Sequence, residues 1–236
     1  MKIGIMTAMQ SEHDLLAALL NDRKEIKNGL FNYVSGSMGN NEIVLRQCGI
    51  GKVNAAVGTA EMIKAFSPDC IISTGVAGGI DTCLKVMDVV VSQTIVHHDV
   101  WCGMGCDKGQ VQGLPTFFTG NATLCKAAEQ LNTLPSQNET KIHAGLICTG
   151  DQFITNKDEL ARIKGDFPAG LACDMESAAI AQTCYIYNIP FVSFRIISDT
   201  PGIDNHIDQY ENFWGEMASR SFTTTKTFLE HLPTSL

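Results

Sequence analysis

The sequence predicts an α/β protein whose mixed, mostly parallel sheet is sandwiched by helices. Three observations support this. Short β-rich runs alternate with helical patterns along all 236 residues. Several of these runs are apolar at every position, as strands covered by helices on both sides must be. No Pro/Ser/Gly-rich linker, charge block or internal repeat divides the alternation, so residues 1–236 are expected to form a single domain.

Strands are predicted at the apolar, β-rich runs. Seven of these cover residues 2–6, 42–48, 70–74, 89–95, 142–148, 171–173 and 191–197. An eighth strand, residues 32–38, is expected to form a hairpin with 42–48 through Gly39, Asn40 and Asn41. Since ligands collect at the carboxyl ends of strands in such sheets, the functional residues should directly follow the strands.

Helices are predicted where apolar residues recur at helical spacing. These segments are residues 53–66, 121–131, 156–163, 177–187 and 208–231. Four prolines fall in the breaks, where they end or separate helices: Pro68, Pro135, Pro168 and Pro190.

Composition excludes several classes of partner. A net charge of −8 and a pI near 5.2 argue against nucleic-acid binding and against anionic membrane surfaces, which require a surplus of Lys and Arg. The longest apolar runs are too short to span a membrane, and the N-terminal run stops at Ser11, too early for a secretory signal. The nine cysteines are odd in number and scattered, so we expect reduced core residues in a cytoplasmic protein.

Two glycine motifs follow predicted strands. The motif at residues 75–79, GVAGG, is either a turn that needs positive φ or a backbone that a ligand approaches closely. The motif at residues 49–52, GIGK, lacks the first glycine and the hydroxyl residue of a nucleotide triphosphate loop, so we interpret it as a turn opening the next helix.

Carboxylates and one arginine follow the later strands. Asp174 is explained by helix N-terminal capping, whereas Glu176 could equally cap the helix or accept the two hydroxyls of a sugar. Arg195 lies inside an apolar strand and therefore predicts an acidic neighbour or an anionic ligand. Asp199 is either a turn former before Pro201 and Gly202 or an acid beside a ligand.

One cluster has the residue types of a metal site. It contains His97, His98, Asp99, Cys102 and Cys106, but no second Cys or His pair stands at the spacing of a zinc finger. A loop with incidental thiols is the favoured interpretation, and no metal and no cofactor are expected.

Six motifs, in order and at matching spacing, resemble the 5′-methylthioadenosine/S-adenosylhomocysteine nucleosidases of the purine nucleosidase/phosphorylase superfamily. They begin at Lys2, Gly49, Gly75, Thr149, Asp174 and Arg195, and the resemblance runs from Lys2 to about Lys226. It implies a three-layer α/β/α, nucleoside phosphorylase-like fold. It also implies hydrolysis of the bond between adenine and a 5′-thio-substituted ribose, without metal or cofactor.

The resemblance further implies residue roles. Asp199 would protonate adenine with Ser198 orienting it, and Glu12 would activate water with help from Arg195. Glu176 would hold the ribose hydroxyls above Met175. The remaining expected substrate-binding residues are Phe153 and Ile154 at the base, Val76, Ala77 and Gly78 in the glycine motif, and Met9, Ile50 and Tyr210 around the alkylthio group. The family takes that last aromatic from a partner subunit, so a homodimer is expected.

Two rival functions remain open. A purine nucleoside phosphorylase would need cationic groups for phosphate, and besides Arg195 and Arg46 the strand ends offer few, while Glu12 would repel the anion. A non-catalytic nucleoside-binding protein would be favoured if Glu12 or Asp199 were absent, and both are present.

Overall fold

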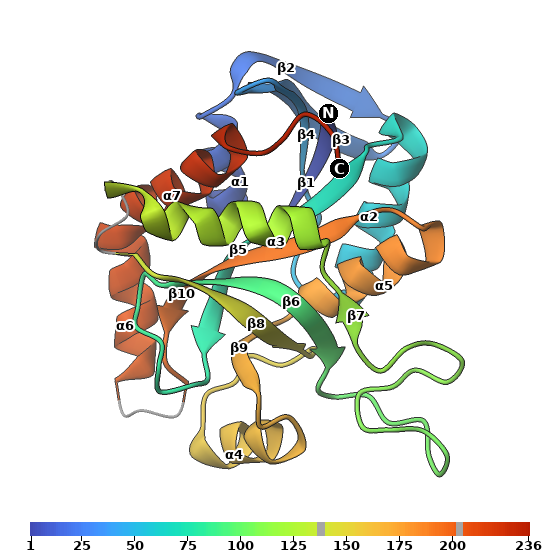
Figure 1. The fold of residues 1–236 in the computed structure, drawn as a ribbon, viewed down its shortest axis with the longest axis vertical. Helices are drawn as coiled ribbons and strands as arrows, with labels where there is room; N and C mark the ends of the chain where they lie inside the picture. Colours follow the sequence, from blue (N-terminus) through green and yellow to red (C-terminus); the bar gives the residue numbers. More distant parts are fainter. Residues whose placement is uncertain (136–139, 202–204) are drawn as a thin grey trace.

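The computed structural model describes residues 1–135, 140–201 and 205–236 (Figure 1). Its strands are β1 (Lys2–Thr7), β2 (Asn21–Asn28), β3 (Phe31–Met38), β4 (Asn41–Gln47), β5 (Cys70–Gly79), β6 (Val89–His97), β7 (Phe118–Thr119), β8 (Ile142–Thr149), β9 (Gly170–Asp174) and β10 (Phe191–Asp199). Its helices are α1 (Gln10–Ala17), α2 (Lys52–Phe66), α3 (Ala122–Gln130), α4 (Lys157–Asp166), α5 (Ser177–Tyr187), α6 (His206–Asn212) and α7 (Ala218–Glu230).

The ten strands belong to one mixed sheet, as predicted, with the order β10-β6-β8-β9-β5-β1-β4-β3-β2 and β7 beside β6. The pairings β1–β4, β1–β5, β5–β10, β6–β8 and β8–β9 are parallel. Because β10 also pairs with β5, the strands β10, β6, β8, β9 and β5 close into a ring. Sequence did not predict this closure, which depends on the last residues of β5, where Gly78 and Gly79 pair with Cys173 and Ala172 of β9.

Helices cover both faces of the sheet (Figure 1). Ile3 and Ile5 of β1 face a core completed by α1, α3 and α7, whereas Met6 of the same strand faces a core completed by α2 and α5. This alternation along one strand is what a sheet buried on both faces requires. A smaller cluster lies under α4. The predicted α/β architecture is confirmed.

Several predicted boundaries were wrong. The strand expected to end at residue 74 continues through Gly79, so the glycine motif extends β5 and forms no turn. Strand β2 escaped prediction because seven of its eight residues are exposed and show no apolar alternation. The single helix expected at residues 208–231 is divided into α6, a π-helical turn at Phe213–Met217, and α7.

The cysteines only partly match the prediction of a reduced core. All nine are free thiols, and five are buried, but Cys83 and Cys102 are exposed. Gly202, named as part of a possible turn after Asp199, lies outside the described residues. In the described part of the chain, no helix has the length and apolar character needed to cross a bilayer.

Candidate active site

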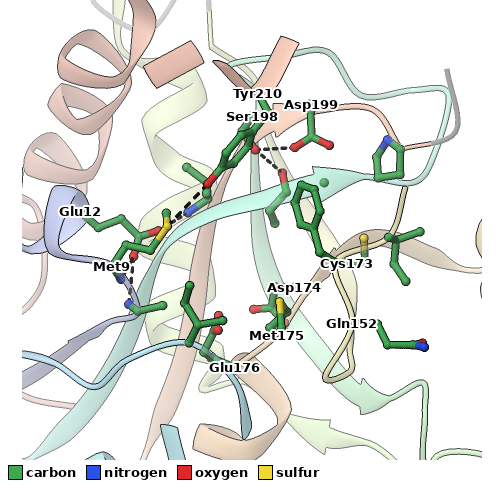
Figure 2. Close-up of a pocket in the computed structure, with 18 residues that line it drawn as sticks. Met9, Glu12, Gln152, Cys173, Asp174, Met175, Glu176, Ser198, Asp199 and Tyr210 are labelled. Atoms are coloured by element: carbon green, nitrogen blue, oxygen red, sulfur yellow. Dashed lines mark hydrogen bonds between the residues drawn. The ribbon is translucent and has the colours of Figure 1, made fainter. Parts of the chain in front are cut away.

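One pocket with an empty volume of about 630 Å³ collects residues at or shortly after the ends of β1, β4, β5, β8, β9 and β10 (Figure 2). Thirteen of the residues predicted from the sequence line it: Met9, Glu12, Ile50, Val76, Ala77, Gly78, Phe153, Ile154, Met175, Glu176, Ser198, Asp199 and Tyr210. Arg195 is the predicted site residue that is not part of the lining.

Glu12 occupies one end of the pocket and is almost completely buried. Its Oε2 accepts hydrogen bonds from the backbone N–H groups of Ala8 and Met9, both at 2.9 Å, and its Oε1 accepts one from Val76 at 3.0 Å. Met9 precedes the first turn of α1, so the two bonds to Oε2 satisfy N–H groups near the start of that helix. Burial raises the pKa of Glu12, while Arg195 and these N–H groups act in the opposite direction.

Gly75 allows this arrangement because it has no side chain. A Cβ at this position would lie 2.3 Å from Oε1 of Glu12 and 2.9 Å from Nη1 of Arg195, and φ is +146°. At Gly75 the group that approaches the backbone is therefore the protein's own carboxylate and not a ligand, as the close-approach interpretation had expected.

Arg195 lies behind the pocket and is completely buried. Its Nε is 2.9 Å from Oδ2 of Asp174, and its Nη2 is 3.5 Å from Oε2 of Glu176. The acidic neighbour predicted for this arginine is thus present. Because its guanidinium is bound to these carboxylates, the help that Arg195 is expected to give Glu12 stays a prediction.

Asp174 caps α5, as predicted, since the Ser177 N–H donates to both of its carboxylate oxygens at 3.3 and 3.2 Å. It also accepts a hydrogen bond from Thr149 Oγ1 at 2.5 Å. Glu176 is bound differently, because its Oε1 accepts the Gly51 N–H at 2.9 Å. Burial raises the pKa of Glu176 to about 7.

Asp199 lies at the opposite end of the pocket from Glu12 (Figure 2). Ser198 Oγ donates a hydrogen bond to its Oδ1 at 2.6 Å. Burial raises the pKa of Asp199, and this hydroxyl and the nearby His206 act in the opposite direction. A carboxyl group with a raised pKa at the rim of an apolar cavity has the properties of a proton donor.

Aromatic and sulfur side chains close the pocket. The rings of Phe153 and Tyr210 meet edge to face at 5.7 Å, and the Tyr210 hydroxyl lies 3.6 Å from the sulfur of Met9 (Figure 2). Tyr210 therefore lines the pocket of its own chain. The prediction that the aromatic near this position comes from a partner subunit is wrong for Tyr210, because α6 folds back over the end of β10.

Five further lining residues were given no role in the pocket from the sequence. These are Ala8, Gln152, Cys173, Asp174 and Pro201. Each is adjacent in sequence to a predicted residue or within two positions of one. Position at or just after the end of a strand was therefore the signal that could have found them.

Three other features singled out from the sequence are the GIGK motif, the histidine and cysteine cluster, and Arg46. Helix α2 begins at Lys52 after Gly51, whose φ of +94° is accessible to glycine, so the turn interpretation of GIGK is confirmed. Among the described residues, His97, His98, Asp99, Cys102 and Cys106 do not assemble a group of three metal ligands. Arg46 lies away from the pocket, hydrogen-bonded to Tyr33 at 3.1 Å and 4.1 Å from the centre of the Phe31 ring.

The fold and this pocket define a member of the phosphorylase superfamily, whose family model matches residues 2–230. A 5′-methylthioadenosine/S-adenosylhomocysteine nucleosidase of Hydrogenovibrio crunogenus is 39% identical over 98% of this chain and 99% of its own length. Within the superfamily, the chain therefore belongs to the 5′-methylthioadenosine/S-adenosylhomocysteine nucleosidases, as its motifs predicted.

Solved structures agree. The nucleosidase of Colwellia psychrerythraea in complex with adenine superposes with a TM-score of 0.93 at 36% identity, covering 100% of this chain and 97% of that one. The nucleosidase of Neisseria meningitidis in complex with methylthio-immucillin-A has a TM-score of 0.91 at 35% identity, covering 98% and 99%.

Proposed function

We propose that the chain hydrolyses the N-glycosidic bond of 5′-methylthioadenosine and S-adenosylhomocysteine, releasing adenine and the 5′-thioribose. The observation that carries the proposal is a single pocket with Glu12 at one end, Asp199 at the other and Glu176 in its lining. Cleavage leaves positive charge on the ribosyl ring and negative charge on the departing purine. Two separated carboxyl groups can act on both sides of that bond.

At the sugar end, Glu12 takes a proton from the attacking water. The bonds from Ala8, Met9 and Val76 fix both of its oxygens and favour the ionised form that a base requires. Arg195, behind the pocket, adds to this effect through its positive charge. The water then attacks the ring carbon as the bond to the purine breaks.

At the base end, Asp199 donates a proton to adenine. Ser198 binds Oδ1, and since no hydrogen bond from the described part of the chain occupies the other oxygen, that oxygen can carry the proton toward N7 of adenine. Phe153 stacks on the adenine ring, and the backbone of Ile154 reads its Watson–Crick edge. Glu176 accepts the ribose 2′ and 3′ hydroxyls above Met175, and Met9, Ile50 and Tyr210 surround the alkylthio group.

The pocket lining favours hydrolysis over phosphorolysis. A phosphate dianion needs cationic donors, yet the described residues of the lining include no Lys, Arg or His and do include Glu12, Asp174, Glu176 and Asp199. Arg195 is already bound to two carboxylates, and Arg46 is remote. Water is therefore the nucleophile that this pocket can accept.

Adenine release in phosphate-free buffer tests this proposal. Methylthioadenosine should yield adenine and free methylthioribose at the same rate with and without phosphate. Strict dependence on phosphate, with a sugar 1-phosphate product, would establish the phosphorylase instead. Tight binding of the nucleoside without any turnover would establish the non-catalytic binding protein.

We also propose that the protein acts as a homodimer in the cytoplasm. Exposed apolar side chains gather on α2, on α5 and on the loop after β6, where Val53 is 75% exposed and Met104 fully exposed. Helices α2 and α5 pack against each other, so their outer faces can form one surface. The nine free thiols fit a reducing compartment.

Sedimentation velocity tests the dimer. The wild-type chain should sediment as a dimer at micromolar concentration, and Val53→Glu should shift it toward the monomer. Leu30→Glu is the matched control, since Leu30 is 93% exposed on the turn between β2 and β3 and belongs neither to α2 or α5 nor to the loop after β6. A fully active wild-type monomer would contradict the proposal.

A further inference from the structure

Lys52, Asp99 and Asp151 form a bridge between three segments that meet beside the pocket. Lys52 Nζ donates to Oδ1 of Asp99 at 2.7 Å, and the Asp151 N–H donates to Oδ2 of the same carboxylate at 2.9 Å. The backbone N–H of Lys52 in turn donates to Oδ1 of Asp151 at 2.7 Å. Together these three hydrogen bonds join the start of α2, the segment after β6 and the segment after β8.

This bridge holds the segment that lines the base end of the pocket. Residues 151–155 form neither helix nor strand. In the described part of the chain, the hydrogen bonds of residues 151–154 are the two that join Asp151 to Asp99 and Lys52. Phe153 and Ile154 directly follow Asp151. Among the described residues, the bridge therefore supplies the hydrogen bonds that place this segment, beside the packing of Ile154 in the cluster under α4 and the ring contact of Phe153 with Tyr210.

The bridge also reaches the ribose side of the pocket. Gly51, the residue before Lys52, donates its N–H to Oε1 of Glu176 at 2.9 Å. A Cβ on Gly51 would lie 3.1 Å from Oδ1 of Asp151, so the two segments are in close contact. A shift of the Asp151 segment relative to Lys52 would therefore be transmitted to the carboxylate that we place on the ribose hydroxyls.

The electrostatics distinguish this bridge from an ordinary surface ion pair. The side chains of Lys52 and Asp99 are only 19% and 20% exposed. Burial raises the pKa of Asp99, but hydrogen bonds from Lys52 and from the Asp151 N–H overcome this and hold it below its usual value. A partly buried carboxylate that accepts one hydrogen bond from an ammonium group and one from a backbone N–H keeps a fixed geometry.

We propose that Lys52 and Asp99 are positioning residues for adenine: their ion pair fixes the 151–154 segment against the base and aligns it with Glu176. The inference rests on the proposed nucleosidase function and assigns base affinity to a pair of side chains outside the pocket lining. Neither side chain touches the substrate. Their contribution should therefore appear in the binding of free adenine, which has no ribose.

The experiment compares Lys52→Met with Lys164→Met. Lys52→Met removes the ammonium group but keeps the backbone N–H that binds Asp151. Lys164 is a matched control, because its Nζ lies 2.8 Å from Oδ2 of Asp81 with side chains 27% and 30% exposed, and neither residue lines the pocket. For each variant, adenine affinity is measured by calorimetry, kcat and KM are measured with methylthioadenosine, and Tm is measured by thermal unfolding.

We expect Lys52→Met to weaken adenine binding roughly tenfold and to lower kcat/KM at least as much, since small displacements of a binding segment are costly. Lys164→Met should leave both within twofold. Asp99→Asn should reproduce the loss, and the double variant should be no weaker than the single ones. The bridge is supported if both single variants lose adenine affinity and the double variant loses no more than either one. An unrelated loss of stability would instead lower Tm without changing adenine affinity.

Adenine affinity within twofold of wild type in folded Lys52→Met and Asp99→Asn would overturn the inference. Strictly additive losses in the double variant would overturn it as well. A wild-type chain that fails to bind adenine and fails to hydrolyse methylthioadenosine would instead contradict the proposed function. The two failures are therefore distinguishable.

Discussion

The two ends of the pocket bury a carboxyl group each, yet they surround it with different partners. At one end, Glu12 accepts three backbone N–H groups and lies near Arg195. At the other end, the donor to Asp199 among the described residues is the Ser198 hydroxyl, and His206 lies nearby. Burial raises the pKa at both ends, so the difference lies in how strongly the neighbours oppose that shift.

This difference indicates how one pocket can hold a base and an acid at the same pH. Fixed N–H donors favour the ionised carboxylate, because they bind negative charge and cannot accept a proton. A single hydroxyl favours it less, since a hydroxyl can also accept a hydrogen bond from a protonated acid. We therefore assign the ionised state to Glu12 and the protonated state to Asp199, and the following predictions test this assignment.

The largest effect is expected at Glu12, the catalytic base. Glu12→Gln keeps the size of the side chain but cannot take a proton from water, so adenine release from methylthioadenosine should be abolished. Substrate binding should change little, because Glu12 is assigned to the water. Steady-state assays and calorimetry measure the two quantities. Retention of substantial turnover in a folded Glu12→Gln variant would remove Glu12 from the mechanism.

At the acid end, Asp199→Asn should lower turnover by about 10² to 10⁴, because the purine would leave without its proton. The variant should still bind adenine and should keep the wild-type Tm within a few degrees. The assay is adenine release at saturating substrate. Near-normal turnover by this variant would leave the acid unassigned.

Gly75→Ala should disturb the pocket only at the end that holds Glu12. The added Cβ would meet Oε1 of Glu12 at 2.3 Å, so it should displace the carboxylate and lower turnover by roughly 10². Adenine affinity should be unchanged, since adenine binds at the other end of the pocket, beside Asp199. Gly165→Ala in α4 is the control, because its Cβ would meet no atom within 4 Å. Equal activity of the two variants would contradict this account.

A smaller effect is expected between the two ends, at Glu176. With a pKa of about 7, its carboxyl group is mostly protonated at pH 6 and mostly ionised at pH 8. The ionised form accepts the ribose hydroxyls, so the affinity of Glu12→Gln for methylthioadenosine should rise by up to roughly tenfold between these pH values. The affinity for adenine should not change between these pH values. Adding Glu176→Gln to Glu12→Gln should remove the rise in methylthioadenosine affinity.

The sequence predicted most of this site because its residues directly follow apolar strands. Asp199, Glu176 and Phe153 could be placed in that way, and all three line the pocket. The helix that carries Glu12 was not predicted, because α1 is short and buries only Glu12, Leu16 and Ala17. The place of Glu12 after the first strand made it a candidate, and the family resemblance supplied its role as the catalytic base.

Features that depend on contacts distant in sequence could not be predicted. The ring closure between β5 and β10 joins residues more than a hundred positions apart. The contact of Gly75 with Glu12 and the return of Tyr210 to its own pocket are also tertiary. A buried arginine predicts a partner but does not say which one. Arg195 binds two carboxylates, whereas Arg46 is stabilised by the rings of Phe31 and Tyr33.

A substrate whose leaving group needs no proton tests the assignment of base and acid most directly. In 4-nitrophenyl 5-methylthioriboside, the nitrophenolate departs without protonation, so only the activation of water remains for the protein to perform. Asp199→Asn should hydrolyse this compound at close to the wild-type rate, while Glu12→Gln should not hydrolyse it. If Asp199→Asn loses as much activity on this compound as on methylthioadenosine, or if Glu12→Gln retains it, the assignment is contradicted.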